Sequence, residues 1–232
     1  MTNIIEYQSF TRDLDVYNHA VNLIIEKFDS QANTIGFATG STMIPLYQLL
    51  KNGPIDFKKV VSFNLDEYVG LRMGHPGSFH TFMKEHIFQY KNFKKNYVPN
   101  GNASDLSGEM EMYEHLLEKH RIDFQILGVG VNGHIGFNEP GTSFSSNTHL
   151  VELTSSTRNE NAKYFPGHSA PSHAITMGIK SILSAKQILL IAMGEKKRAP
   201  LEALLSGVID ESCPITALNL HSNVSVLTNL TL

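Results

Sequence analysis

The sequence predicts an α/β fold in which an open, mostly parallel sheet is covered by helices on both faces. Short apolar runs of strand length alternate with segments whose apolar residues recur at helical spacing. The strand runs are apolar throughout, which is typical of parallel strands buried between two layers of helices. Clusters of glycine, serine and threonine follow several runs, at the strand ends where open parallel sheets carry their binding sites.

The first half of the chain supplies two predicted strands and three predicted helices. In the first helix Pro45 lies near the start, where a missing backbone N–H costs least. The second helix follows from apolar side chains at helical spacing, among them Phe79, Phe82 and Ile87. Ser107 is the expected N-cap of the third helix. The predicted strands are 33–38 (NTIGFA) and 60–65 (VVSFNL), and the predicted helices are 42–52, 78–90 and 107–120.

The second half continues the alternation with three predicted strands and one predicted helix. Residues 142–171 stand apart because they are rich in Ser, Thr and Asn and poor in apolar residues, so we expect a mobile lid there. No linker divides the chain, so residues 1–232 are expected to form one domain. The strands are 123–129 (DFQILGV), 186–193 (KQILLIAM) and 223–228 (NVSVLT), and the helix is 195–207, ending at Gly207.

Composition and charge argue against several classes of protein. The 232 residues are 41% hydrophobic and 18% charged, which is ordinary for a globular protein. A net charge of -3, without any block of five like charges, gives little support to nucleic-acid or membrane-surface binding. The single Cys213 cannot form an internal disulfide, and the N-terminal residues lack a signal-peptide pattern. We therefore expect a soluble, cytoplasmic protein.

The densest cluster of turn residues is GVGVNGHIGFNEPG, at 128–141, directly after a predicted strand. It matches the G-x-G-x-x-G dinucleotide fingerprint, with Glu152 at about the distance of a ribose-binding acid. That fingerprint also needs a helix after its third glycine, and here further glycines and a proline follow instead, which disfavours it. We expect His134 and Glu139 to point into one cavity, and a purely structural loop is the alternative.

A second cluster, ATGST at 38–42, lies between a predicted strand and a predicted helix. Exposed N–H groups at a helix start favour a phosphate, and Ser41 and Thr42 add hydroxyl donors. A serine or threonine that only caps the helix N-terminus, without a bound phosphate, would give the same sequence pattern. Another predicted strand is followed by Lys196, Lys197 and Arg198, and a cation there can bind the same phosphate or face solvent.

A pair of acids, Asp66 and Glu67, ends the second predicted strand. Two solvated loop acids would be the commoner reading of such a pair. An acid that is partly desolvated at this edge of the sheet would have a raised pKa and could carry protons near neutral pH. We expect Asp66 to meet the ATGST and GVNGHIGFNEPG segments there, because the carboxyl ends of parallel strands share one edge of a sheet.

The sequence has no H-E-x-x-H motif and no cysteine cluster, so we expect no metal site. Ser41 is not expected to be a covalent nucleophile, because no G-x-S-x-G elbow surrounds it. The remaining histidines of interest lie in polar turns or on amphipathic segments, namely His75, His80, His86, His115, His120 and His221.

Taken together, ATGST, FNLDEYVGL, GHPGSFHTFM, GVNGHIGFNEPG and AITMGIKSIL resemble the glucosamine-6-phosphate deaminase family, in order and over nearly the whole chain. The pair LDEYVGL and GHIGFNEPG is the most specific part. The resemblance implies a Rossmann-like sheet. It also implies conversion of a small-molecule partner, glucosamine 6-phosphate, with water to fructose 6-phosphate and ammonia, without a cofactor.

The resemblance also implies roles for particular residues. Asp66 matches the group that moves a proton between C2 and C1 of the open-chain sugar. His134 matches the group that opens the ring, with Glu139 in support, and Asn132 stands where other members have Asp or Asn. The positions that match the phosphate site are Gly40, Ser41, Thr42, Lys197 and Lys163, the last where arginine is more usual.

Two rival functions remain open at this stage. A 6-phosphogluconolactonase would have a similar sheet and a similar Gly-His loop, but lactone hydrolysis does not require the acid Glu139. A non-catalytic sugar-phosphate sensor would not need acid-base residues. His149, Val151 and Glu152 stand where hexameric relatives carry a basic cluster for an allosteric activator, so we expect an unregulated enzyme, and a monomer.

Overall fold

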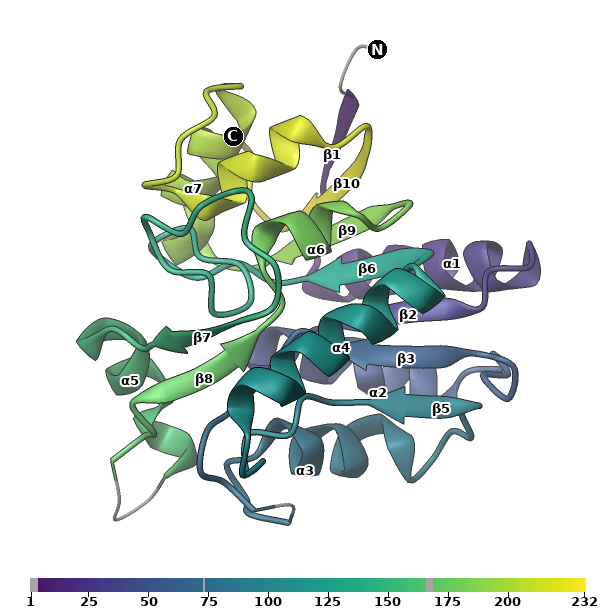
Figure 1. Ribbon diagram of the computed structural model, residues 1–232. Coiled ribbons are helices and arrows are strands. Elements are labelled where there is room, and N and C mark those ends of the chain that lie inside the picture. Colours follow the sequence, from purple (N-terminus) through teal and green to yellow (C-terminus); the bar gives the residue numbers. More distant parts are fainter. Residues whose placement is uncertain (1–3, 73, 166–168) are drawn as a thin grey trace.

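A parallel sheet forms the centre of the protein in a computed structural model. The structure describes residues 4–72, 74–165 and 169–232, without the side chains of Glu160 and Lys163. The sheet's seven described strands run in the order β1-β10-β9-β6-β2-β3-β5, and every pairing is parallel (Figure 1). The strands are β1 (Ile4–Ser9), β2 (Thr34–Phe37), β3 (Val61–Asn64), β5 (Lys95–Tyr97), β6 (Phe124–Leu127), β9 (Ile188–Ala192) and β10 (Asn223–Thr228).

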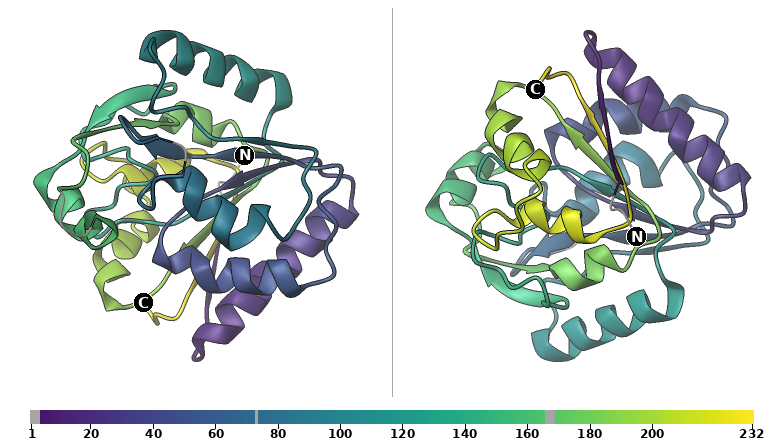
Figure 2. Two further views of the ribbon diagram at one scale, coloured as in Figure 1. Left: turned by 90° about the horizontal axis from the view of Figure 1, so that it is seen from below. Right: turned by 90° about the horizontal axis from the view of Figure 1, so that it is seen from above.

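Helices lie on both faces of this sheet, as predicted. Helices α1 and α2 pack together on one side, whereas α4 and α6 lie on the other (Figure 2). The α-helices are α1 (Asp13–Asp29), α2 (Ile44–Asn52), α3 (Phe79–Met83), α4 (Leu106–His120), α5 (Ser155–Asn161), α6 (Ile179–Leu183) and α7 (Arg198–Leu205). Short 3-10 helices are η1 (Ser41–Met43), η3 (Ala162–Tyr164), η4 (Glu195–Lys197) and η5 (Pro214–Leu220), and η2 (Lys84–Phe88) is π-helical.

A second, three-stranded antiparallel sheet was not predicted from the sequence. It is formed by β4 (Asp66–Tyr68), β8 (His173–Thr176) and β7 (His149–Glu152), in the order β4-β8-β7. Strand β4 begins two residues after β3 ends, so the chain passes directly from the large sheet into the small one. These short strands escaped prediction because β4 reads as the end of β3 and β7 lies in a polar segment.

The hydrophobic core follows the two sheets. All five residues of β9 are buried, as are all four of β2, β3 and β6, which is why these strands read as continuous apolar runs. A smaller cluster supports the second sheet, and Leu153 and Phe165 from the segment 142–171 belong to it. That segment therefore has apolar anchors that its overall composition concealed.

Most predicted elements are confirmed, with two corrections. Helix α4 begins at Leu106, and its N-cap is Asp105, whose carboxylate accepts a hydrogen bond from Gly108 N at 3.0 Å. Ser107 was the wrong cap because an aspartate two residues earlier offers the same acceptor. The expected lid is not bare of structure, since it contains β7, α5 and η3, while residues 166–168 of it lie outside the described part.

Candidate active site

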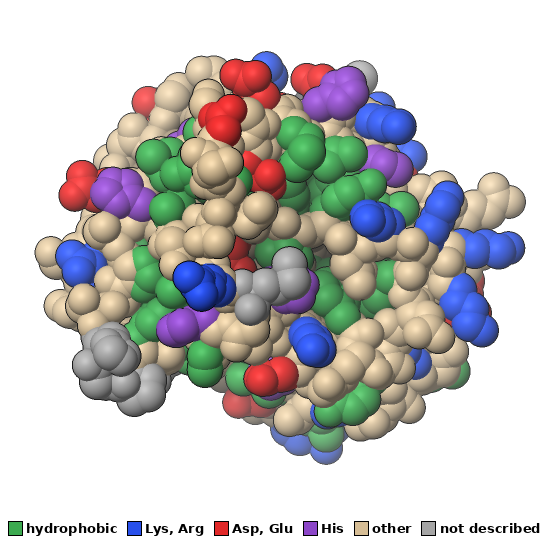
Figure 3. Space-filling view, turned by 60° about the horizontal axis from the view of Figure 1, so that its bottom comes forward, with side chains coloured by type: hydrophobic (Ala, Val, Ile, Leu, Met, Phe, Trp, Pro, Cys, Tyr) green, Lys and Arg blue, Asp and Glu red, His purple; other side chains and the backbone are tan. Residues whose placement is uncertain are grey.

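A cavity of about 450 Å³ opens at the carboxyl ends of the parallel strands. Its walls are formed by the residues that follow β2, β3, β6 and β9, which confirms the predicted convergence of these strand ends. Figure 3 shows that acidic, basic and histidine side chains share one face of the molecule. The segments that line the cavity are 38–43, 65–66, 76–79 with Phe82, 128–130, 134 with 136–137, Asn161 with Tyr164, and 196–197.

Asp66, the first residue of β4, lines this cavity and is only 5% exposed. Burial, and secondarily the nearby charge of Glu67, raise the pKa of Asp66 well above its usual value. Its Oδ1 is buried and has no hydrogen-bond partner among the described residues. A buried carboxyl without protein donors has its full basicity available for a ligand, which is the property expected of a general base.

Glu67 faces away from the cavity and has a structural task. Its carboxylate accepts hydrogen bonds from Tyr68 N, Ser78 Oγ, Phe79 N and His80 N, at 2.7–2.9 Å. Three of these donors lie at the start of α3, so Glu67 caps that helix and holds the cavity wall formed by Ser78 and Phe79. The two acids are therefore not a pair of solvated loop residues, since both are buried with opposite orientations along β4.

His134 reaches the cavity because the chain around it bends tightly. Gly133 N donates to Gly130 O at 3.1 Å, and Gly130 N donates to His134 O at 2.8 Å, which folds the loop back on itself. The imidazole then lies directly against Gly130, where an added Cβ would come within 2.1 Å of the ring atom Cε1. Gly130 is thus required by close approach of the ring, not by a dinucleotide.

The same loop is tied to Asp66 through β8. Asp66 pairs with Thr176 across the antiparallel sheet, and the Thr176 hydroxyl accepts a hydrogen bond from Phe137 N at 3.1 Å. Gly136, with φ of 59°, passes so close that an added Cβ would lie 3.5 Å from Asp66 Oδ2. One short strand therefore sets the position of both acid-base groups.

Asn132 and Glu139 form a hydrogen-bonded chain behind the imidazole. Asn132 Oδ1 lies 2.7 Å from His134 Nδ1, and Asn132 Nδ2 donates to Glu139 Oε2 at 2.9 Å. Glu139 does not line the cavity, so the expectation that it points into it together with His134 was wrong. The 3.9 Å between His134 Nδ1 and Glu139 Oε2 is bridged by the amide instead.

The direction of each bond in this chain can be assigned. The backbone N–H of His134 also points to the same side-chain atom of Asn132, at 3.3 Å, and an N–H requires an oxygen there. With the amide oxygen toward His134, its NH2 must face Glu139, which accepts. The imidazole Nδ1 therefore carries a proton that it donates to Asn132, and Nε2 is the basic nitrogen of the neutral ring.

Four of the five expected phosphate residues line the same cavity. Gly40, Ser41, Thr42 and Lys197 all line it, as does Lys196. Gly40 and Gly194 have the same unusual backbone, with φ of 99° and 85°, and each opens a 3-10 turn after its strand. Arg198 is drawn away, because its guanidinium pairs with Glu195 and Glu202. The side chain of Lys163, the remaining expected residue, lies outside the described residues.

Several lining residues were not singled out by sequence reasoning. Phe79, Phe82 and Phe137 form an apolar part of the wall, and Asn161 and Tyr164 reach it from α5 and η3. Phe79 and Phe82 had been assigned only to helix packing, Phe137 belongs to the glycine-rich loop, and no motif marked Asn161 or Tyr164. Their residue types carry no signal of a site. They line the cavity only because of where the fold places their segments.

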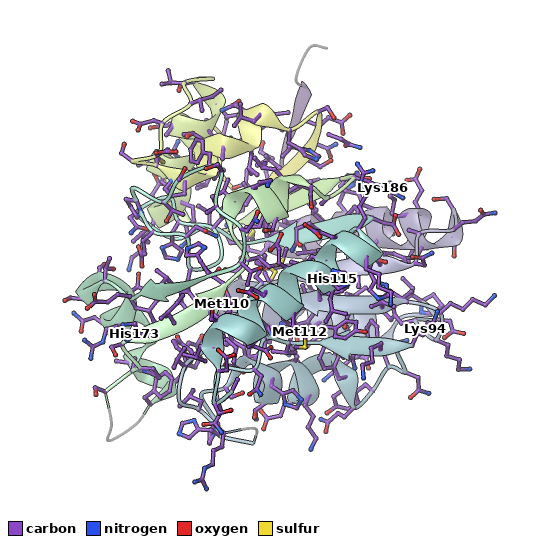
Figure 4. The ribbon with its side chains drawn as sticks, viewed as in Figure 1. Lys94, Met110, Met112, His115, His173 and Lys186 are labelled. Carbon is purple, nitrogen blue, oxygen red and sulfur yellow. The ribbon has the colours of Figure 1, made fainter. Side chains whose placement is uncertain are left out.

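Two other histidines among the described residues lie away from this cavity. His115 lies on α4 and His173 on β8 (Figure 4), and neither lines the cavity. No three His, Cys, Asp or Glu side chains in the described residues are placed to hold a metal ion. In the same part of the chain no helix is long and apolar enough to cross a bilayer.

Comparison with known proteins gives consistent results over nearly the whole chain. The family described as glucosamine-6-phosphate isomerases/6-phosphogluconolactonase matches residues 15–227. A glucosamine-6-phosphate deaminase of Lysinibacillus sphaericus is 52% identical over 200 residues, covering 86% of this chain and 90% of the relative. One of Listeria monocytogenes is 48% identical over 207 residues, with 88% of each chain covered.

Solved structures agree with this result. A monomeric glucosamine-6-phosphate deaminase superposes with a TM-score of 0.91 at 40% identity, covering 97% of both chains. A 6-phosphogluconolactonase from Shewanella baltica superposes with a TM-score of 0.79 but only 21% identity, covering 98% of this chain and 99% of its own. At that identity the second likeness supports the fold alone.

Proposed function

The chain belongs to the family of glucosamine-6-phosphate isomerases and 6-phosphogluconolactonases, and within it we propose the site residues that carry out a deaminase reaction. The protein is an enzyme of amino sugar catabolism that converts glucosamine 6-phosphate and water to fructose 6-phosphate and ammonia. The observation that carries the residue assignment is the pair of separate acid-base groups, Asp66 and His134, in one cavity.

Ring opening is assigned to His134. The hydrogen-bond chain gives the neutral ring a basic Nε2, which takes the proton of the sugar O1 hydroxyl and returns it to the ring oxygen O5 as the C1–O5 bond breaks. The developing imidazolium is stabilised by Asn132 and, through it, by Glu139. An amide in this position orients the ring without adding a second negative charge next to it.

Isomerisation is assigned to Asp66. Its carboxylate removes the proton from C2 of the open-chain aldehyde while O1 takes up a proton, which gives an enolamine. It then delivers a proton to C1 while the amine gives up one proton, which gives a ketimine. Water then adds at C2 and ammonia leaves, so that one water is consumed and one ammonia is released. The raised pKa of Asp66 suits this task, because a stronger carboxylate base removes a carbon-bound proton more readily.

The phosphate is assigned to the turn at Gly40, Ser41 and Thr42, together with Lys197, which also lines the cavity. The N–H groups at the start of η1 and the two hydroxyls can donate to phosphate oxygens, and the ammonium supplies the opposite charge. Lys163 remains part of this proposal. Binding of this remote group positions C1 and C2 against the two acid-base residues.

Further properties follow the same proposal. The enzyme works in the cytoplasm as a monomer, without a cofactor and without a nucleic-acid or membrane partner, and the 97% coverage by a monomeric relative supports the monomer. His149, Val151 and Glu152 of β7 offer no cationic cluster for an activator phosphate. The segment 142–171 serves as a lid, and amide hydrogen exchange faster there than in β9, without ligand, would support this.

The experiment that tests the function measures ammonia released from glucosamine 6-phosphate by the purified protein. Stoichiometric ammonia and fructose 6-phosphate are expected. The control substrate is 6-phosphogluconolactone, which the lactonases of the same family would hydrolyse. Lactone hydrolysis without ammonia release would replace the deaminase by a lactonase, and binding of the sugar phosphate without turnover of either substrate would indicate a sensor.

A further inference from the structure

The carboxylate of Glu139 is held at its far end by α5. Thr157, which is 2% exposed, donates its hydroxyl hydrogen to Glu139 Oε1. Thr154, the N-cap of the same helix, accepts from Thr157 N at 3.2 Å and donates its hydroxyl hydrogen to the same carboxylate oxygen over a longer distance, 3.3 Å. The other oxygen, Oε2, accepts from Asn132, so the carboxylate is fixed at both ends.

The hydrogen-bond chain therefore extends from α5 to the imidazole, with donors converging from both sides on the Glu139 carboxylate. Thr157 donates to Glu139, Asn132 donates to Glu139, and His134 Nδ1 donates to Asn132. A carboxylate that accepts at both oxygens cannot release its hold on the Asn132 amide, because turning it would leave Oε1 buried without a donor. The orientation of the amide, and through it the proton on Nδ1, depends on this anchor.

We propose that Thr157 is a positioning residue for ring opening, which holds Glu139 and Asn132 so that His134 keeps its Nδ1–H tautomer. This inference rests on the proposed role of His134, but the state of the imidazole can be measured without any substrate. Thr157 itself lies outside the cavity wall and reaches the reacting atoms only through the three side chains of the chain.

The position of Thr157 also links this chain to the cavity wall. Asn161 follows four residues later on the same face of α5, and it lines the cavity, as does Tyr164 of η3. A ligand that contacts Asn161 therefore contacts α5, the helix whose preceding turn carries Thr157 and binds Glu139. The α5–η3 segment connects occupation of the cavity with the orientation of the imidazole.

The test compares two substitutions of Thr157 in the whole protein. Thr157→Val removes the hydroxyl and keeps the shape, whereas Thr157→Ser keeps the hydroxyl. Two-bond ¹H–¹⁵N correlation NMR of the histidine rings, assigned with His134→Gln, reports which ring nitrogen carries the proton. We expect one Nδ1–H tautomer in the wild type and in Thr157→Ser, and a mixture with Nε2–H in Thr157→Val.

Turnover provides the second readout. For Thr157→Val we expect kcat with glucosamine 6-phosphate to fall about tenfold or more, with KM within about twofold, because only the oriented base is lost. Thr157→Ser should retain kcat. If Thr157→Val does not fold, the same two measurements are made on Thr157→Ala, with the same expectations.

Thr148 offers a matched control within the same segment. Its hydroxyl donates to the Glu114 carboxylate at 2.6 Å, so Thr148→Val also breaks a threonine–glutamate bond, but away from the cavity. It should leave the His134 tautomer unchanged. A wild-type tautomer in Thr157→Val would overturn the proposal even if the protein were less stable, since that pattern marks a purely structural threonine. Absence of ammonia release by the wild type would instead overturn the proposed function.

Discussion

Adding one methyl group at Gly130 should selectively disable His134. A Cβ at this position would lie 2.1 Å from Cε1 and 2.2 Å from Nδ1 of the imidazole. A carbon–carbon contact needs about 3.5 Å, so the ring must move by roughly 1.4 Å. The Nδ1 hydrogen bond to Asn132 is 2.7 Å long and cannot survive a shift of that size in most directions. A misplacement of about 1 Å in a reacting group costs on the order of 10²-fold in rate.

We therefore expect Gly130→Ala to lower kcat with glucosamine 6-phosphate by about 10²-fold in a coupled ammonia assay. Gly130 does not adopt a positive φ, so alanine should not strain the backbone. Gly128→Ala is the matched control, because its added Cβ would meet only the flexible end of Met43, at 3.3 Å, and should cost less than about tenfold. Gly130→Ala activity within threefold of the wild type, in a folded protein, would refute the account of how His134 is placed.

Three further outcomes are expected. Asp66→Asn should remove most turnover with little change in KM. In the wild type the folded state binds the Asp66 proton more tightly than the unfolded state, so the free energy of unfolding should fall as pH rises from 3.8 through the raised folded pKa of Asp66. Asp66→Asn should abolish this fall, which urea unfolding at several pH values measures. Glu67→Gln should shift the acid limb of the kcat/KM profile to lower pH, because one of the causes that raise the pKa of Asp66 is removed, whereas Ser78→Ala should leave the limb in place. Rate against glucosamine 6-phosphate concentration should be hyperbolic and unchanged by N-acetylglucosamine 6-phosphate; a sigmoidal curve made hyperbolic by that compound would show an allosteric site.

Most of the large sheet and the cavity were predictable because their signals are local, whereas the edge strands β1 and β5 were not predicted. Strands such as β9 are buried along their whole length, so an apolar run marks them without knowledge of their neighbours. Strand ends of a parallel sheet meet by geometry, so Asp66, Ser41 and His134 could be placed at one edge from their order in the chain alone.

The second sheet and the far part of the hydrogen-bond chain were not predictable in this way. Strand β4 is three residues long and is defined by its pairing with β8, more than 100 residues later. Thr157 is one polar residue in a polar segment, and its contact with Glu139 depends on where α5 packs. The expectation that Glu139 enters the cavity failed because loop spacing cannot show that Asn132 stands between it and His134.

The most direct test of two separate acid-base groups is deuterium exchange at C1 of fructose 6-phosphate with ammonia in D2O, followed by NMR. The reverse reaction starts from a ketose that opens spontaneously, so it reaches the Asp66 step without the ring-opening base. We predict exchange with the wild type and no exchange with Asp66→Asn. His134→Gln should still catalyse exchange, and its exchange rate should be reduced far less than its turnover of glucosamine 6-phosphate. Equal loss of exchange and turnover in His134→Gln, or wild-type exchange in Asp66→Asn, would contradict the assignment.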